Sequence, residues 1–300
     1  MRRVLVVLLL LLAGCGMFGT KTPEESIHVG TQGLVLTLDT ATPPQKIFMG
    51  DPFSLVGTIA NKGAADVDNG VLSVGIEDDF VAMDGPRVKQ VRLTGRSALN
   101  PMGQTQTLRL DMTSKALPAM TETVTTNILL SLCYPYKTVA SVPVCLDTDL
   151  ENKVKNKPCT MGSVSLGGGQ GGPVGVSRVD QAMRASEDTT KAVPMFTITV
   201  DNLGDGQVLA PESVADACTG KPVQGMNHAN VHVFLVDQEL SCSKQGTATV
   251  SFQPGQNVVR CSLPDGITKT AGAYNSVLRV EVDYGYSSTV SRQVQIVRGR

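Results

Sequence analysis

Short segments in which apolar and polar residues alternate recur along almost the whole chain. Residues 196–200 alternate with a period of two, and residues 278–284 do so again. Successive side chains of a strand point to opposite faces, so this period is typical of strands with one buried face. The same pattern predicts strands at 34–38, 53–60, 71–76, 88–93, 107–112, 128–134, 139–146, 174–179, 231–236, 248–252, 258–263 and 290–297. One short helix is considered at 179–186. Many short strands separated by turn residues predict an all-β sandwich protein.

Composition narrows the classes of protein that remain. The chain has 300 residues, of which 41% are hydrophobic and 18% charged, enough for about two packed domains. A net charge of −1 without a basic block excludes a typical nucleic-acid binder. Three His and no Trp argue against a His-rich metal enzyme and against an aromatic sugar-binding surface. We expect no cofactor and no metal.

Two segments recur in order along the chain. Residues 58–63 match 199–204 at an offset of 141, and residues 130–136 match 280–286 at an offset of 150. The repeat predicts two tandem β-sandwich domains, at 33–147 and 173–298, joined by a linker at 148–172. Four of the five tyrosines lie in the repeated Tyr-x-Tyr, between the last two strands predicted in each half. We expect them to close the end of each core, with hydroxyls on backbone or water; the alternative is an aromatic ligand site.

The N-terminus has the pattern of an export signal. Arg2 and Arg3 precede an apolar run at 4–12, which is too short to span a bilayer. The residues before and at Cys15, Leu-Ala-Gly-Cys, resemble the lipobox of prokaryotic lipoproteins, which implies cleavage after residue 14 and a lipid on Cys15. The alternative is simple secretion with Cys15 discarded. Residues 15–32 are expected to form a flexible tether, which would place the first domain near the outer side of the cytoplasmic membrane.

Six cysteines remain after Cys15, and an even number in an exported chain fits three disulfides. Cys242 and Cys261 flank a predicted hairpin symmetrically, which favours their pairing. Cys145 and Cys159 bracket a polar stretch and form the second expected pair. Cys133 is left with Cys218 in a bond between the two domains; the alternative joins Cys159 to Cys218. No Cys-x-x-Cys occurs, so a zinc site is not expected.

Catalytic motifs are not found in the sequence. It has no Gly-x-Ser-x-Gly elbow, no His-Glu-x-x-His helix and no phosphate loop, so we nominate no catalytic residue and expect no enzyme. The glycine-dense segment 167–172 is interpreted as a flexible or bulged joint. The carboxylates of residues 147–151 are interpreted as a solvated loop rather than a calcium site. His228 and His232 are favoured as surface histidines over a metal pair.

The second half carries an insertion. Residues 71–74 correspond to 231–234 at an offset of 160, so the second half has 19 extra residues, since 160 − 141 = 19, placed at about 210–230. Loops on rigid sandwiches commonly carry recognition. One hypothesis makes this loop a partner-binding surface, with Cys218, Lys221, His228 and His232 as its candidate residues. The equally supported alternative is a loop without function that Cys218 holds in place.

Residues 50–53 lead through a predicted strand at 54–60 into an Asn-x-Gly turn at 61–67, and a further predicted strand follows at 70–74. This run resembles the start of CARDB-like, immunoglobulin-type modules of prokaryotic surface proteins, and exported archaeal proteins with a similar first domain. The resemblance implies an immunoglobulin-like sandwich. It implies an adhesive, spacer or binding role by association only, because fold alone does not fix function.

The expected function is that of a lipid-anchored, non-enzymatic surface protein for adhesion, envelope organisation or partner binding. Its expected partners are the membrane, through Cys15, and other surface or envelope components. Two alternatives stay open: a subunit of a surface polymer that pairs edge strands, and an accessory lipoprotein of an uptake or secretion complex.

Overall fold

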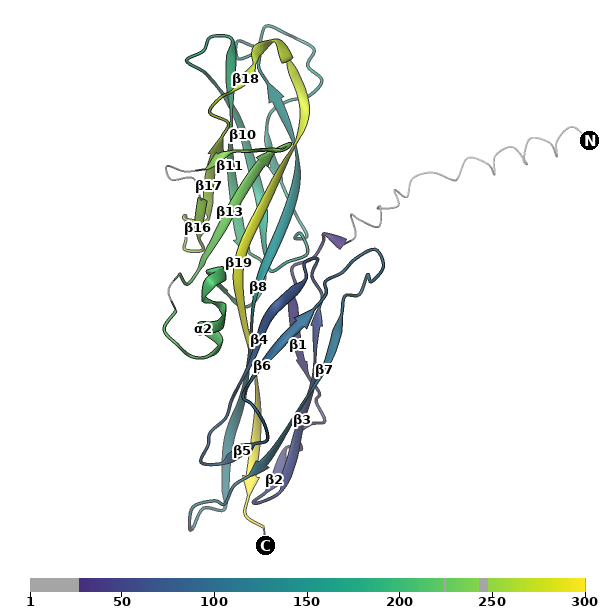
Figure 1. Ribbon diagram of the computed structural model, residues 1–300, viewed down its shortest axis with the longest axis vertical. Helices are drawn as coiled ribbons and strands as arrows, with labels where there is room; N and C mark the ends of the chain where they lie inside the picture. The colour runs from purple at the N-terminus through teal and green to yellow at the C-terminus, as the bar shows by residue number, and fades with distance from the viewer. Residues whose placement is uncertain (1–26, 224, 243–247, 300) are drawn as a thin grey trace, which may run out of the picture.

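The computed structural model describes residues 27–223, 225–242 and 248–299, and these form a long, narrow molecule built almost entirely of strands (Figure 1). The expected signal peptide and Cys15 lie outside the described residues. Two β-sandwiches stand end to end, and their buried side chains form one continuous hydrophobic core. The predicted all-β class, with packing of the immunoglobulin-like kind, is confirmed.

The first sandwich occupies the end of the molecule that holds the C-terminus. One layer is a four-stranded sheet in the order β1-β3-β7-β5, and the other contains β6, β4, β8, β19 and β2. Buried and accessible side chains alternate along its strands, as the sequence pattern predicted. The bounds are β1 (Leu34–Leu38), β2 (Lys46–Phe48), β3 (Pro52–Asn61), β4 (Val67–Gly75), β5 (Val81–Met83), β6 (Val88–Leu93), β7 (Thr105–Ser114), β8 (Thr123–Asp147) and β19 (Ala273–Val297).

The second sandwich has a six-stranded layer in which β15, β17, β11, β10 and β9 follow one another and β18 pairs with β11. The other layer contains β14, β13, β19 and β8, with β16 on β13 and β12 on β19. The bounds are β9 (Ser163–Ser165), β10 (Val174–Ala185), β11 (Lys191–Asn202), β12 (Gln207–Leu209), β13 (His228–Leu235), β14 (Gln238–Glu239), β15 (Ser241–Cys242), β16 (Ala248–Ser251), β17 (Val258–Ser262) and β18 (Ile267–Thr268). A short 3-10 turn, η2 (Lys269–Ala271), precedes β19.

Strands β8 and β19 belong to both sandwiches. Each is 25 residues long, and they pair antiparallel from Ala273 opposite Asp147 to Val297 opposite Thr123. Residues 289–297 fall in the expected second domain but pair with β8 and β2 in the first sandwich. Residues 139–147 of the expected first domain pair with β19 in the second sandwich. Each sandwich therefore contains a strand segment from the other half of the chain (Figure 1).

The strand breaks predicted at the two Tyr-x-Tyr motifs are wrong. Pro135 and Gly285 look like turn residues, but they lie opposite each other at the centre of the β8–β19 pair. Strand β4 pairs with β8 only up to Cys133, so Pro135 has a paired strand on one side alone. Proline is tolerated in a strand where its missing N–H faces no neighbour.

An approximate two-fold axis through the Pro135–Gly285 pair exchanges the two sandwiches. The offset that relates the two Tyr-x-Tyr motifs also maps β8 onto β19, so Pro135 and Gly285 are equivalent positions. Equivalent strand pairs repeat around this axis: β1–β3 with β10–β11, β3–β7 with β11–β17, β4–β8 with β13–β19, and β4–β6 with β13–β16.

Pairing register corrects the size of the insertion. Leu72 lies opposite Leu132, and Val231 lies opposite Val282, which is the equivalent of Leu132. The offset there is 159 rather than 160, so the insertion is one residue shorter than the sequence comparison predicted. The error arose because Val71, on the outer face, is also apolar: it packs against the Cys133–Cys218 disulfide.

The helix considered at 179–186 is wrong, because these residues lie mostly in β10, which pairs with β11 along nearly its full length. Strand pairing overrides the weak local helical pattern. Helical structure occurs instead in the inserted loop, as η1 (Pro211–Ser213) and α2 (Val214–Cys218).

Candidate binding cleft at the waist

The four tyrosines of the two Tyr-x-Tyr motifs meet in the core at the middle of the molecule, which we call the waist. Tyr134 pairs with Tyr286 across the β8–β19 pair, and Tyr136 pairs with Tyr284. The ring centroids of both pairs are 5.9 Å apart, as the two-fold axis requires. Tilted and edge-on contacts at such distances add stability beyond simple burial. The tyrosines thus form one cluster shared by both sandwiches.

Two hydroxyls of this cluster, one from each motif, fix a turn of the backbone. The Tyr136 hydroxyl accepts from the Ala65 amide at 3.0 Å, and the Tyr286 hydroxyl accepts from the Gly206 amide at 2.6 Å. In each half the anchored amide lies four residues after the Asn of the repeated Asn-x-Gly turn. The side-chain amide of Asn61 donates to the Ala65 carbonyl, and the side-chain amide of Asn202 donates to the Gly206 carbonyl. The repeat seen in the sequence is therefore a repeated tyrosine-to-turn contact.

Burial favours the protonated, neutral form of the tyrosine hydroxyls in the cluster. It raises the pKa of Tyr136 to about 12 and that of Tyr284 well above its usual value. The Tyr284 hydroxyl is bound to the Thr138 hydroxyl and to the Val174 amide. The expectation that the hydroxyls reach backbone is confirmed, but the rings lie where the two cores meet and not at a separate end of each.

In the glycine-dense segment 167–172, residues 169–172 are buried, whereas Gly167 and Gly168 are exposed, so the first alternative of a flexible or bulged joint does not hold for residues 169–172. A Cβ on Gly171 would lie 2.6 Å from the Ala64 Cβ, and one on Gly172 would lie 2.4 Å from the Thr138 hydroxyl. The Gly171 carbonyl accepts from the Tyr136 hydroxyl and from the Ala64 amide. Only glycine allows the backbone this close to the tyrosine cluster.

Part of the expected tether belongs to the folded body. The Arg96 guanidinium donates to the carbonyls of Ile27 and Val29. Gly30 exchanges backbone hydrogen bonds with Gly168 and Gly171. Residues 27–32 are therefore fixed at the waist, where they join the first sandwich to the segment entering the second.

The six cysteines form the three favoured pairs, Cys133–Cys218, Cys145–Cys159 and Cys242–Cys261. Disulfides of this number are typical of proteins that fold in an oxidising, extracytoplasmic compartment. Among the described residues, no helix is long and apolar enough to cross a membrane.

The inserted loop covers one face of the waist. Helix α2 packs on β4, β8 and β19, and Val214 and Cys218 bury themselves against Val71 and Cys133. The Cys133–Cys218 bond ties the loop to the shared strand β8. The surface of this loop remains a candidate for partner binding. The disulfide and the packing of α2 hold it in place.

The other candidate residues of that loop lie apart from one another. Exposed Lys221 pairs with Asp216 on the loop itself. His228 and His232 lie on β13, where His228 contacts the Met226 carbonyl and His232 pairs with Glu239. Among the described residues, no hydrogen bond or ion pair links Lys221 to either histidine.

Two of the three carboxylates of 147–151 are held by one lysine, and the third, Glu151, pairs with Lys153. Lys157 lies 2.6 Å from Asp147 and 3.2 Å from Asp149. Hydrogen bonds from the Val154 and Lys153 amides, with Lys157 beside them, lower the pKa of Asp149. Within the part of the chain that is described, no group of three or more His, Cys, Asp or Glu side chains is placed to hold a metal.

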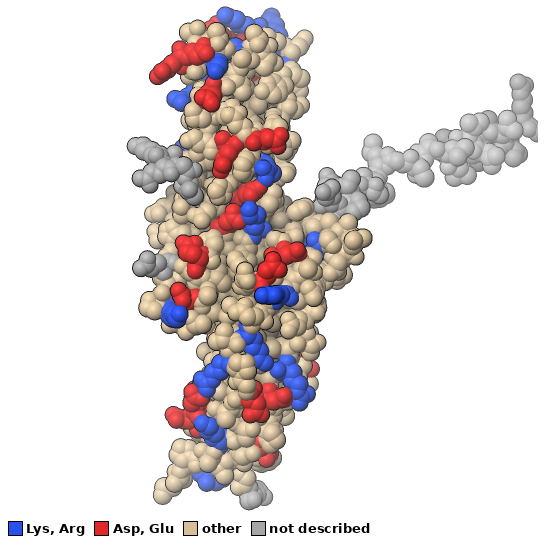
Figure 2. All heavy atoms as spheres, in the orientation of Figure 1, with Lys and Arg blue, Asp and Glu red and all other residues tan. Residues whose placement is uncertain are grey.

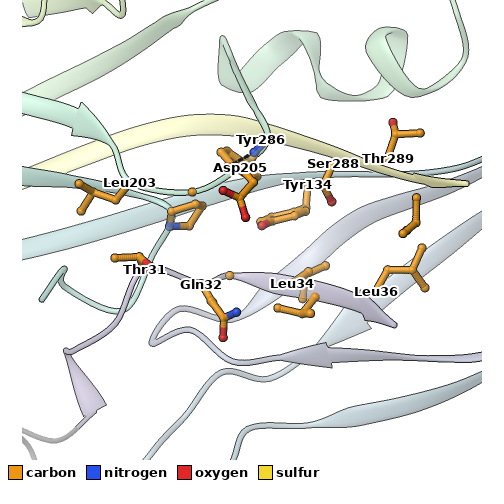
Figure 3. Close-up of a pocket in the computed structure, with 16 residues that line it drawn as sticks. Thr31, Gln32, Leu34, Leu36, Tyr134, Leu203, Asp205, Tyr286, Ser288 and Thr289 are labelled. Atoms are coloured by element: carbon orange, nitrogen blue, oxygen red, sulfur yellow. Dashed lines mark hydrogen bonds between the residues drawn. The ribbon is translucent and has the colours of Figure 1, made fainter. Parts of the chain in front are cut away.

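A cleft of about 290 Å³ opens on the waist beside the tyrosine cluster (Figure 3). One wall is β1 with the residues before it, including Gln32, Leu34 and Leu36. The opposite wall is β19 from Tyr286 to Val290, and the floor includes Tyr134. Asp205 supplies a carboxylate at the rim, so the cleft combines an aromatic and aliphatic surface with a few polar groups, as binding sites commonly do.

Beyond the cleft, β19 has an unpaired edge. Strand β12 pairs with residues 285–287 and β2 with residues 295–297, and no described strand pairs with the edge between them. On the inner face of this stretch, Ser288, Val290 and Arg292 are only half-buried. At the equivalent positions of β8, Thr138, Ala140 and Val142 are at most 2% exposed. The first sandwich is therefore open where the second is closed.

Sequence reasoning missed this cleft and edge because residues from several separate segments build them. The only available signal was the departure of Ser288 and Arg292 from the apolar residues that an inward-facing position usually carries.

No family model and no curated protein matches the chain. Among solved structures it is similar to the secreted serine protease VesC from Vibrio cholerae, at 12% identity and a TM-score of 0.23, over 84% of this chain and 50% of that one. The chain thus spans about half of the VesC structure. The CupB6 tip adhesin from Pseudomonas aeruginosa (10% identity, 91% and 100% covered) and an enterococcal surface protein N-terminal region (8%, 89% and 87%) have TM-scores of 0.19 and 0.18. At these TM-scores the similarities carry no argument about function.

Proposed function

We propose that this chain is an exported surface protein, anchored by a lipid on Cys15, that works without catalysis in adhesion, envelope organisation or partner binding. The observation that carries the proposal is the pairing of all six cysteines beyond Cys15, which leaves that one thiol for modification. The shared strands β8 and β19 support a mechanical role, because they make the two sandwiches one continuous body. The cleft at the waist is a surface on which a partner could bind.

The anchor is tested with the full chain in cells of its source. Cys15→Ser is expected to abolish labelling with a fatty-acid analogue and to move the protein out of the membrane pellet, because a hydroxyl does not replace the thiol that carries the lipid. Met17→Ser, which leaves the quartet ending at Cys15 intact, serves as the control and is expected to stay labelled and pelleted. A Cys15→Ser chain that remains labelled and pelleted would contradict the proposed anchor.

Partners are identified by cross-linking and mass spectrometry on intact cells. Surface or envelope proteins linked through residues of the waist would support the proposal. Links confined to subunits of a transport or secretion machine would replace it with the accessory-subunit function.

A second function, subunit of a surface polymer, is favoured by the unpaired edge of β19. The Gln295 amide donates to Gln45 at this edge, and strand alternation points the amides of Thr289, Ser291 and Gln293 the same way. An added strand could pair with these groups. Arg292 opposes such pairing, since it is a charged, inward-facing residue of the kind that protects edges, and it donates to the Asp39 carbonyl at 2.7 Å.

If chains pair through this edge, Ser291→Pro is expected to abolish their association while leaving the β8–β19 pairing intact. Proline removes an amide that faces solvent and not the neighbouring strand. Light scattering on the purified mature chain gives the oligomeric state, with Ser291→Ala as the matched control. A wild-type chain that stays monomeric at high concentration excludes the polymer.

A further inference from the structure

The loop between β6 and β7 exposes two large apolar side chains at the waist. Leu99 is 99% exposed and Met102 is 80% exposed. The loop is not a loose segment. The Ser97 amide donates to the Asn100 carbonyl, the Asn100 amide donates back to the Ser97 carbonyl, and the Gly103 amide closes the turn on Asn100. This backbone holds both apolar side chains away from the core.

The same loop is attached to the first described residues of the folded body. Arg96, at its base, binds the carbonyls of Ile27 and Val29. Figure 1 shows the described chain beginning beside this loop, and the surface next to that point carries few charged side chains in Figure 2. Leu99 and Met102 therefore lie close to the point where the tether joins the folded body.

The length of that tether limits the distance to a membrane. Eleven residues separate Cys15 from Ile27. Fully extended, they reach at most about 40 Å. A lipid on Cys15 would thus keep the waist within about 40 Å of the bilayer.

We propose that residues 97–102 form a membrane-contacting loop, in which Leu99 and Met102 enter the interface of the bilayer that holds the lipid of Cys15. The inference rests on the proposed anchor. Apolar side chains presented by an ordered backbone lose little conformational freedom on insertion. Their burial in the interface would add to the attachment that the lipid provides.

The chain contains no tryptophan, so a single one reports on its own surroundings. Leu99→Trp places it on the loop. Met120→Trp is the matched control, since Met120 is 96% exposed on the loop between β7 and β8, which Arg298 contacts. Each mature chain, starting at Cys15, is coupled through the Cys15 thiol to vesicles of phosphatidylglycerol and phosphatidylcholine that contain a maleimide lipid.

On these vesicles the tryptophan emission of the Leu99→Trp chain is expected to move to shorter wavelength and to be quenched by brominated acyl chains. The emission of the Met120→Trp chain is expected to stay as in solution. Emission from Leu99→Trp that is as unshifted and unquenched as that from Met120→Trp would overturn the loop. Because the lipid is coupled chemically, this result does not depend on processing in cells. Absence of lipid on Cys15 in cells would instead remove the proposed anchor, so the two failures are distinguishable.

Discussion

A chain that stops at Ser288 is expected to lose the folded state of its first half, although that half begins near the opposite end of the sequence. The missing segment contains Val294 and Ile296, which are 1% and 0% exposed in the first core. Burying two such side chains contributes about 3–6 kcal/mol, against a total stability of about 5–15 kcal/mol for a typical domain. The truncation also removes the partner strand of residues 123–131.

Hydrogen exchange of a chain that starts at Cys15 measures this loss directly. Amides of β3 (Pro52–Asn61), in the opposite sheet, are expected to lose their protection, whereas a chain ending at Arg298 should retain it. Protection of β3 that survives removal of residues 289–300 would contradict the sharing of β19 between the sandwiches.

Tyr284→Ala is expected to destabilise both sandwiches together, by about 3–5 kcal/mol, as removal of a large buried aromatic side chain does. The Tyr284 side chain is 0% exposed and lies between the cores. Its loss also leaves the buried Thr138 hydroxyl and the Val174 amide without their partner. Thermal unfolding gives the loss of stability, and hydrogen exchange in β3 and β11 shows whether both halves respond.

The fifth tyrosine provides the control. Tyr274 lies outside the waist cluster and is only partly buried, so Tyr274→Ala should cost much less. Tyr284→Phe separates the ring from its hydroxyl, and leaving two buried groups unpaired is expected to cost about 1–3 kcal/mol. If Tyr284→Ala lowers protection in one sandwich only, the cluster does not couple the two cores.

The fold class was accessible from the sequence because alternation is a local property. Residues 196–200 and 278–284 have the pattern of strands, and they are strands. Two of the three disulfides were predictable for a similar reason. Cys242 and Cys261 flank the polar turn of one hairpin, and Cys145 and Cys159 are close in sequence. The Cys133–Cys218 pair was not settled by the sequence, because the alternative of Cys159 with Cys218 stayed open.

The continuity of β8 and β19 was not accessible in this way. Pro135 and Gly285 are typical turn residues by local criteria. They are 150 residues apart in the sequence, and both strands continue through them because the two strands pair without interruption there. The interpretation of the glycine-dense segment 167–172 as a flexible or bulged joint also depended on local pattern alone. In the sequence alone, Gly171 and Gly172 indicate a flexible segment. In the fold, Ala64 and a tyrosine hydroxyl lie so close to them that no larger residue fits. The exposure of Leu99 likewise has no sequence signature, since an apolar residue in a loop can equally well be buried.

The sharing of β19 also sets an order of events during synthesis. Domains commonly fold from the N-terminus as they emerge. Here residues 289–297, which complete the first sandwich, are the last part of it to be made. The first half therefore cannot finish folding before residues 289–297 have been translated.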